Sequence, residues 1–295
     1  MQVDKNIPEI SFQNIHNKSF EFQLVGNREI LLNRVAGTPD PFRPHRIHFY
    51  AILFILEGEG KHFIDFQSYD YKKGSIIFIS KDQVQAFEHN SKREAYFLLF
   101  TENFIERGSL NSSLMQQLSL YNYHLYSPVV QLKEKEYIFF ENLVRQIKSE
   151  YDAPDDILTE EIIQSSLKIF LGIAERIRKK NRVTVSPSKY QSEFNDFQKM
   201  LNQKIFTTRQ VQFYAQQMGM STKKLNRITQ DVINKPAKSY ISDILIIEIK
   251  RFLINTSLSI KEISYKTGFE DPTNFVKFFK KYTNSTPIDF RKNHF

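Results

Sequence analysis

The stretch from Ser259 to Lys292, SIKEISYKTGFEDPTNFVKFFKKYTNSTPIDFRK, predicts two short helices joined by a tight turn. Gly268 lies where the turn is expected, since glycine accepts a positive φ without steric cost. Asp271 is a good helix N-cap, and Pro272 suits the first position of a helix. The pattern is that of a helix-turn-helix, in which the second helix is anchored by one face and presents the other.

The second helix of this stretch carries apolar and polar residues on different faces. The residues expected to anchor it are Phe275, Phe278, Phe279 and Tyr282. The residues left to solvent are Thr273, Asn274, Lys277, Lys280 and Lys281. Such polar side chains contact phosphates and base edges in a DNA major groove. A single copy of the pattern would favour a solvated basic helix over an ordinary aromatic core.

The same pattern occurs earlier, in VQFYAQQMGMSTKKLNRITQDVINKPAKSYI (211–241). Gly219 marks its turn, Ser221 its N-cap, and Leu225 and Ile228 are expected to anchor its second helix. Because both copies have matching turns and caps, the pair favours DNA binding over a merely solvated helix. The DNA-contacting residues predicted in this copy are Ser221, Thr222, Lys223, Lys224, Asn226 and Arg227.

The segment between the two copies, residues 237–257, is apolar and lacks glycine and proline, which predicts one continuous helix. About 17 residues at 1.5 Å each give a rod of about 25 Å. A rigid spacer of that length suits two recognition helices placed in successive major-groove segments, ~34 Å apart along the duplex.

The charge of the chain is concentrated in its C-terminal part. The whole chain has 295 residues and a net charge of +8, while residues 182–295 contain 19 Lys and Arg against 9 Asp and Glu. A basic half joined to a nearly neutral half indicates a polyanion-binding domain joined to a sensing or assembly domain. A general solubility bias is the alternative.

Several classes of protein are excluded by composition. There are no cysteines, so disulfides, thiolate metal sites and cysteine nucleophiles are absent. No apolar run approaches the roughly 18 residues of a membrane span, and the N-terminus lacks the pattern of a signal peptide. We therefore expect a cytoplasmic protein that has no membrane partner.

The N-terminal half changes its periodicity part-way along. From about residue 45 to 105, short runs rich in Ile, Phe, Tyr and Leu alternate with turn signals, which predicts a small antiparallel barrel or sandwich. Two amphipathic helices are predicted within residues 133–180. We predict an α+β chain of two domains: 1–181, with the barrel at about 20–110, and an all-α domain at 193–295, joined by a linker at 182–192.

Residues 195–292 resemble the DNA-binding domain of AraC/XylS-type transcription regulators. The resemblance is carried by YAQQMGMSTKKLNRI, IKRFLINTSLSIKEIS and GFEDPTNFVKFFKKYTNSTPIDFR. In this family the connecting helix usually has an Arg near Ile244 and an Ala near Ile249, and a Gly where this chain has Asn284. Asparagine tolerates the left-handed conformation, so we expect the turn at Asn284 to survive.

The resemblance also implies how the protein works. It implies a sequence-specific regulator that binds double-stranded DNA through two helix-turn-helix motifs, and that contacts RNA polymerase if it is an activator. Residues 42–105 are similar to the opening strands of the family's cupin barrel, which binds a small effector in many members while adjacent helices form a homodimer. A barrel filled by its own side chains is the alternative to an effector site.

The N-terminal half offers candidate sites of two kinds. The pocket residues expected for an effector are Arg43, His45, Tyr50 and His62. His45, His48 and Glu57 invite comparison with metal-binding cupins, but Gln85 stands where a further ligand histidine is expected and His89 is displaced by four residues. We expect no metal, cofactor or catalytic residue. A cupin metalloenzyme and a nonspecific architectural DNA-binding protein are the alternative functions.

Overall fold

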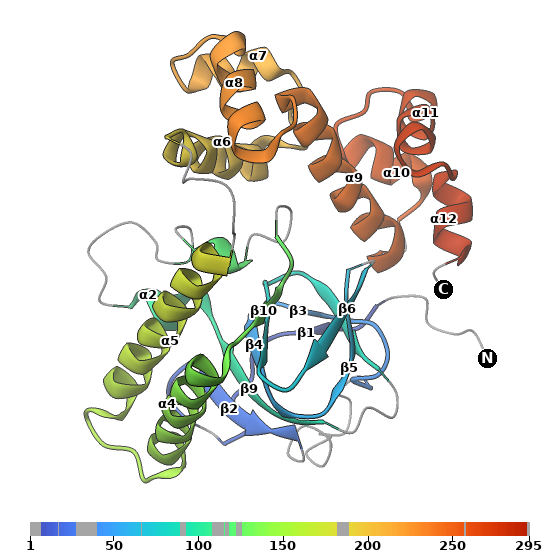
Figure 1. The fold of residues 1–295 in the computed structure, drawn as a ribbon. Coiled ribbons are helices and arrows are strands. Elements are labelled where there is room, and N and C mark those ends of the chain that lie inside the picture. The colour runs from blue at the N-terminus through green and yellow to red at the C-terminus, as the bar shows by residue number, and fades with distance from the viewer. Residues whose placement is uncertain are drawn as a thin grey trace, which may run out of the picture. The chain divides into compact units, whose positions relative to one another are not determined.

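The computed structural model divides the chain into two compact units, one formed by residues 8–183 and one containing residues 184–295 (Figure 1). The residues it describes are 7–16, 18–27, 40–65, 67–88, 93–107, 115, 118–121, 126–181, 189–256 and 258–293. The first unit contains all the described strands, and the second is helical. The predicted α+β class is therefore confirmed.

The first unit contains two five-stranded sheets that face each other. One sheet has the order β1 (Glu9–Ile10), β3 (His45–Ile47), β8 (Val84–Phe87), β5 (Glu59–Ile64) and β6 (Gln67–Lys72). The other has the order β10 (Val129–Gln131), β7 (Ser75–Ile79), β4 (Tyr50–Glu57), β9 (Glu94–Phe100) and β2 (Phe22–Gly26). All neighbours are antiparallel except β1 and β3, which are parallel.

Strand β4 is apolar along almost its whole length because both of its faces are buried. Successive side chains of a strand point to opposite faces. Ala51, Leu53 and Ile55 accordingly pack in the core between the two sheets. Tyr50 and Ile52 pack in a second core on the other face of the same sheet. The run YAILFIL thus lies between two cores.

Helices cover the outer face of the β4 sheet. They are α2 (Glu102–Glu106), the short 3₁₀ helix η1 (Ser119–Tyr121), α4 (Glu134–Asp152) and α5 (Thr159–Asn181). Figure 1 shows α4 and α5 side by side along the barrel. Their contact is centred on Phe140 and Phe170, whose ring centroids are 4.6 Å apart. The predicted helical region at 133–180 corresponds to this pair.

The last turns of α5 hold the chain that precedes β10. Arg178 donates hydrogen bonds to the carbonyl oxygens of Ser119, Leu120 and Ser127. The carboxylate of Glu175 accepts from the backbone N–H and the hydroxyl of Ser119, at 2.9 and 2.8 Å. Both charged side chains are buried, and these bonds compensate for their loss of water.

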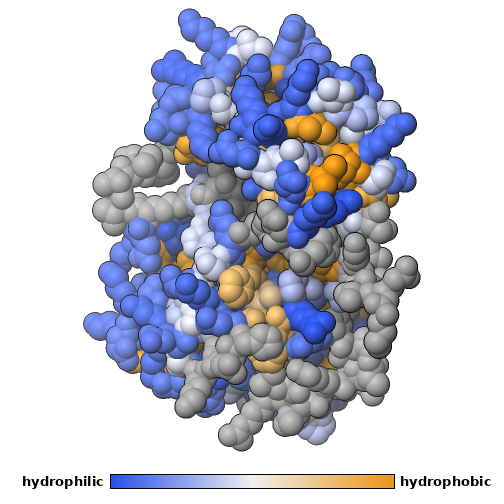
Figure 2. Space-filling model, turned by 90° about the vertical axis from the view of Figure 1, so that its right-hand side faces the viewer, coloured by the Kyte–Doolittle hydropathy of each residue, from blue (hydrophilic) through white to orange (hydrophobic). Residues whose placement is uncertain are grey.

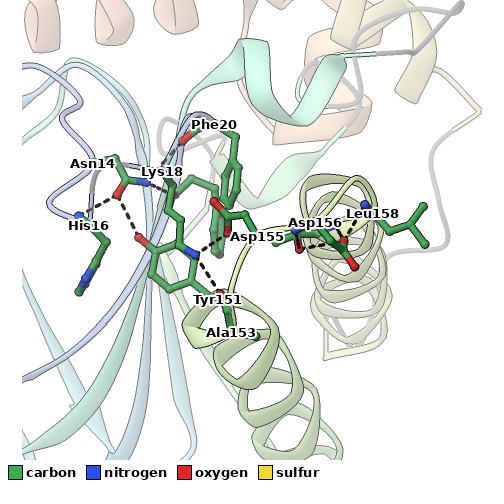
Figure 3. A network of polar contacts seen from close by, with 11 residues as sticks. Asn14, His16, Lys18, Phe20, Tyr151, Ala153, Asp155, Asp156 and Leu158 are labelled. Carbon is green, nitrogen blue, oxygen red and sulfur yellow. Dashed lines mark hydrogen bonds and ion pairs between the residues drawn. The ribbon is translucent and has the colours of Figure 1, made fainter.

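The N-terminal segment is attached to the end of α4 by a polar network (Figure 3). Tyr151 donates from its hydroxyl to Asn14 Oδ1 at 3.2 Å, and Asn14 Nδ2 donates to the carbonyl of Phe22 at 2.7 Å. Lys18 donates to the carbonyl of Ala153 at 3.1 Å and pairs with Asp155 at 2.5 Å. The C-terminus of α4, which is the negative end of the helix dipole, also favours the positive charge of Lys18.

The second unit consists of short helices arranged around one longer helix. They are α6 (Gln191–Lys204), α7 (Val211–Gln217), α8 (Thr222–Ile233), α9 (Ala237–Asn255), α10 (Ile260–Lys266), α11 (Pro272–Thr283) and α12 (Pro287–Asn293). In Figure 1, α9 lies between the α7–α8 pair and the α10–α11 pair. Helix α6 begins inside the segment expected to be the linker, of which residues 182–188 lie outside the described part.

Helix α9 is the core of this unit. Its residues Ile244 and Ile249, which replace the family's usual Arg and Ala, are buried. Tyr240 packs against Phe194 of α6 at 5.4 Å and accepts a hydrogen bond from Gln198 at 2.8 Å. In the described part of the chain, no helix has the length and hydropathy to cross a membrane.

The network of Figure 3 gives a prediction about local opening. Tyr151→Phe removes the hydroxyl that donates to Asn14 while the buried ring stays in place. The loss of one such bond costs about 1 kcal/mol, so we expect roughly fivefold faster hydrogen exchange in residues 14–22. Mass spectrometry of the exchanged full-length protein measures this. Tyr137→Phe is the control, and equal exchange in both variants would contradict the role of the network.

Candidate nucleic-acid interface

The first helix-turn-helix has the local geometry that its sequence predicts. Gly219 has a φ of +64° in the turn after α7. The hydroxyl of Ser221 accepts from the backbone N–H of Lys224 at 3.2 Å, which caps α8. Asn234 ends α8 in the left-handed conformation, with a φ of 53°. Each end of α8 is therefore set by one residue with a specific backbone or capping role.

The second helix-turn-helix repeats this geometry with different residues. Gly268 has a φ of +76°. Asp271 caps α11 by accepting from the backbone N–H of Thr273 at 2.8 Å, and Pro272 occupies the first turn. Asn284 ends the helix with a φ of 57°. The expectation that asparagine can replace glycine at this turn is confirmed.

The anchoring faces agree with the sequence in most positions. Leu225, Ile228, Phe275 and Phe279 are buried. Phe278 is only partly buried, and the prediction for Tyr282 is wrong, because its side chain is 38% exposed. The two rings pack on each other with their centroids 4.8 Å apart, and Tyr282 belongs to the last turn of α11.

The opposite faces of α8 and α11 are exposed and basic. The exposed residues are Ser221, Thr222, Lys223, Lys224, Arg227, Thr273, Asn274, Lys277, Lys280 and Lys281. Within the described residues, Lys223, Lys224, Lys277 and Lys280 have no acidic ion-pair partner, which leaves them available to an external anion. Figure 2 shows hydrophilic side chains over most of one face of this unit. The two surfaces have the charge that phosphate binding requires.

Asn226 differs from the other predicted contact residues. Its Oδ1 accepts from the backbone N–H of Ala237 at 3.0 Å, and its Nδ2 donates to the carbonyl of Thr222 at 3.0 Å. Ala237 is the first residue of α9, so Asn226 satisfies one of the free N–H groups there. Both the oxygen and the nitrogen of the amide are therefore bonded within the protein. The helical periodicity of α8 does not predict these bonds.

Arg291, part of the sequence signature, joins the last helix to α9. Its guanidinium donates to the carbonyls of Leu253 and Leu258, at 2.8 and 2.7 Å. These carbonyls lie at and just beyond the end of α9, where helix carbonyls lack internal partners. The end of α9 is thereby fixed to the second helix-turn-helix.

The barrel interior contains part of the predicted effector pocket. His45 and His62 are both buried and lie on either side of β8, next to Gln85. His62 Nε2 is 3.0 Å from Gln85 Oε1, and His45 Nδ1 is 2.9 Å from the carbonyl of Arg43. His45, Gln85 and His62 therefore form a row of buried polar side chains beside the apolar core between the two sheets.

The other two predicted pocket residues do not join this row. Arg43 is exposed. Tyr50 lies in the core under the helices, on the outer face of its sheet, where it contacts Phe100 at 5.7 Å and Tyr121 at 4.9 Å. The proposed grouping of the four residues is therefore corrected: only His45 and His62 share a site.

Burial controls the protonation of these histidines. Burial, with the positive charge of Arg93 nearby as the next cause, lowers the pKa of His62 to about 3. Burial also lowers the pKa of His45. His62 Nδ1 is buried without a hydrogen-bond partner among the described residues. Both side chains are neutral at pH 7.

The candidate metal ligands have other partners. His48 is on the surface, with its ring nitrogens 2.7 Å from Asp82 and 3.3 Å from Glu9. Glu57 pairs with Lys73 at 2.7 Å. No group of three or more His, Asp or Glu side chains suited to a metal occurs in the described part of the chain. His89 lies outside that part.

Both units match models of known protein domains. The family model of the AraC-like ligand binding domain matches residues 35–167, and a helix-turn-helix domain model matches residues 214–293. The chain is an AraC-type transcription regulator. It has an N-terminal ligand-binding domain and a C-terminal DNA-binding domain, as the resemblance implied.

Relatives of this AraC-type regulator align over most of its length. The Msm operon regulatory protein of Streptococcus mutans is 24% identical over 82% of this chain and 84% of the relative. The transcriptional activator RhaR of Mannheimia succiniciproducens is 22% identical over 85% of this chain and 87% of the relative. Among solved structures, unsaturated fatty acid-bound ToxT from Vibrio cholerae aligns with a TM-score of 0.43 and 16% identity, covering 92% of this chain and 95% of that one.

The lowered pKa of His62 predicts a pH dependence of stability. An unfolded histidine titrates near 6.5, so below that pH the unfolded state binds a proton that folded His62 excludes. The free energy of unfolding should fall as pH drops from 6.5 toward 3, by up to about 1.4 kcal/mol per pH unit. His62→Gln should make this decline shallower in calorimetry between pH 7.5 and 5. His48→Gln is the exposed control, and parallel curves for the wild type and His62→Gln would refute the assignment.

Proposed function

We propose that this regulator recognises a specific DNA sequence by placing α8 and α11 in two adjacent major-groove segments. The observation that carries the proposal is the duplicated arrangement of an N-capped helix with a buried apolar face and an exposed face rich in Lys and Thr. Helix α9 between the copies has 19 residues, or about 28 Å. That length is compatible with successive major-groove segments ~34 Å apart.

Roles on these helices follow from position and chemistry. The first residues of a recognition helix reach base edges most readily, which favours Thr222, Lys223, Thr273 and Asn274 as base-contacting residues. The lysines farther along α11 are placed to bind phosphates. Such contacts position the protein on the duplex but do not discriminate between sequences. Asn226 is left out of the base-contacting set because both ends of its amide are already bonded.

The N-terminal unit is proposed to regulate this binding without catalysis. A small effector bound near His45 and His62, or pairing of two chains, would change how the DNA-binding units are presented. Because RhaR is named a transcriptional activator, we also propose RNA polymerase as a partner. We place the protein in the cytoplasm, where bacterial regulators meet their DNA.

The proposal is tested by selecting duplexes from a random pool with the full-length protein. We expect one enriched sequence containing two half-sites, bound at least about 10³-fold more tightly than random duplex. Equal binding to all duplexes would instead indicate a nonspecific architectural protein and overturn the proposal.

Lys277→Ala should weaken binding to the selected duplex. Lys277 is exposed and has no acidic partner in the described chain, so it is free to contact a phosphate. We expect a similar fractional loss on selected and random duplexes, and a slope of log affinity against log salt that is shallower by about one. Lys199→Ala, which removes the same charge from an exposed position of α6, is the control. Unchanged affinity at moderate salt would remove this position from the interface.

We further propose that two chains pair through the outer side of α4 and α5. Phe139, Ile162 and Ile169 are 40%, 39% and 50% exposed. Ile162 and Ile169, seven residues apart, share one face of α5. Because the helices are antiparallel and Phe140 meets Phe170, Phe139 and Ile169 project to the same side of the pair. A second copy would bury this apolar strip.

A matched pair of variants tests this interface. Ile169→Glu places a charge in the apolar strip and should give a monomer in sedimentation at micromolar concentration, where the wild type is a dimer. Ile138 is equally exposed, at 50%, but lies about 100° around α4 from Phe139. Ile138→Glu should leave the dimer intact. A wild-type monomer, or equal loss in both variants, would contradict the proposed surface.

A further inference from the structure

The loop between α6 and α7, residues 205–210, lies directly against the turn of the second helix-turn-helix. A Cβ atom on Gly268 would lie 2.3 Å from the carbonyl oxygen of Phe206, so only glycine fits this approach. The positive φ of Gly268 adds a second reason for glycine here. The loop that precedes the first helix-turn-helix therefore contacts the second one directly, without α9 in between.

Arg209 holds this contact with its side chain. Its guanidinium lies over the ring of Phe269, 3.9 Å from the centroid, and its Nη2 donates to the carbonyl of Gly268 at 3.2 Å. A planar guanidinium can stack flat on the ring while one of its N–H groups donates, whereas the tetrahedral ammonium of a lysine has no flat face to stack. Arg209 is partly buried by the contact.

The loop is firmly attached to the first helix-turn-helix. The hydroxyl of Tyr214, a fully buried residue of α7, donates to the carbonyl of Thr208 at 2.8 Å. The N–H of Thr208 donates to the carbonyl of Lys204 at the end of α6, at 3.0 Å. These bonds fix the backbone next to Arg209 relative to α6 and α7.

Phe269, on which Arg209 stacks, packs in turn on the recognition helix α11. Its ring centroid is 5.4 Å from that of Phe275 and 5.3 Å from that of Phe278. A continuous series of packed groups thus runs from α7, through Arg209 and Phe269, to α11. Arg291 holds the second motif at the far end of α9, and Arg209 supplies a separate point of attachment.

We propose that Arg209 is a positioning residue that fixes the angle between the recognition helices α8 and α11, and so sets the half-site spacing that the protein accepts. The inference rests on the proposed use of both helices on one duplex. When two linked binding elements are held in the correct geometry, the second binds at high effective concentration, and loosening the geometry lowers it.

The relative placement of α8 and α11 can be measured in the free protein as the distance between a label on each helix. Because the chain has no cysteine, Gln230→Cys on α8 and Lys281→Cys on α11 provide two unique spin-label sites. Electron–electron double resonance should give one narrow distance distribution in this background. Adding Arg209→Ala should broaden it at least about twofold, and Arg209→Lys should broaden it similarly because it keeps the charge but loses the stack. Circular dichroism checks folding, and Arg209→Lys serves if Arg209→Ala does not fold. An unchanged width would overturn the proposal.

Binding then shows whether the angle matters for DNA. The probes are the selected duplex, the same duplex with one base pair inserted between its half-sites, and a duplex with one half-site scrambled. Arg209→Ala and Arg209→Lys should each lose about tenfold on the selected duplex, discriminate less against the insertion, and bind the single half-site within about twofold of wild type. Lys199→Ala, the control for charge, should keep the wild-type spacing preference.

These outcomes separate Arg209 from a simple phosphate contact. If Arg209 bound a phosphate, Arg209→Lys would retain affinity and the single half-site would be weakened as much as the full duplex, which would refute a positioning role. If the wild type prefers no duplex, the proposed function fails, while the spin-label distances still decide whether Arg209 fixes the angle.

Discussion

A short recognition helix must be stabilised by one face so that the other stays free, and the architecture of the C-terminal unit follows from this constraint. Helices α8 and α11 have 12 residues each, a length at which an isolated helix is marginal in water. Caps at Ser221 and Asp271, and left-handed ends at Asn234 and Asn284, supply part of the missing stability. The rest comes from buried apolar side chains beneath each helix. The exposed face is not needed for stability and is therefore free to carry the basic residues.

The same constraint explains why the two motifs share supports. A buried face needs a neighbour, and α9 serves both motifs because it is apolar on most of its circumference. Its ends are held by side chains whose hydrogen-bonding groups match free backbone groups, Asn226 at the beginning and Arg291 at the end. The contact of Arg209 with Gly268 then adds a link that does not pass through α9. The DNA-binding unit thereby has defined geometry without a large core.

The N-terminal unit is subject to a different constraint, because the sheet that contains β4 packs against a hydrophobic core on each of its two faces. Strand β4 is buried on both sides, so its sequence is uniformly apolar and does not show which residues point inward. This is why Tyr50 was expected in the barrel and lies instead under the helices. His45 and His62 are on the facing sheet, and their inward orientation depends on the register between β3, β8 and β5.

The sequence by itself determined the class of the protein, its division into a β-rich and a helical unit, and the turns and caps of both helix-turn-helix motifs. These features are local: a glycine at positive φ, an N-cap and an apolar stripe act over a few residues. Only the tertiary structure decided that Asn226 supports α9, that Tyr282 is 38% exposed and that Arg209 contacts the turn at Gly268. Gly268 lies 59 residues from Arg209, and a contact across such a distance depends on how whole helices pack.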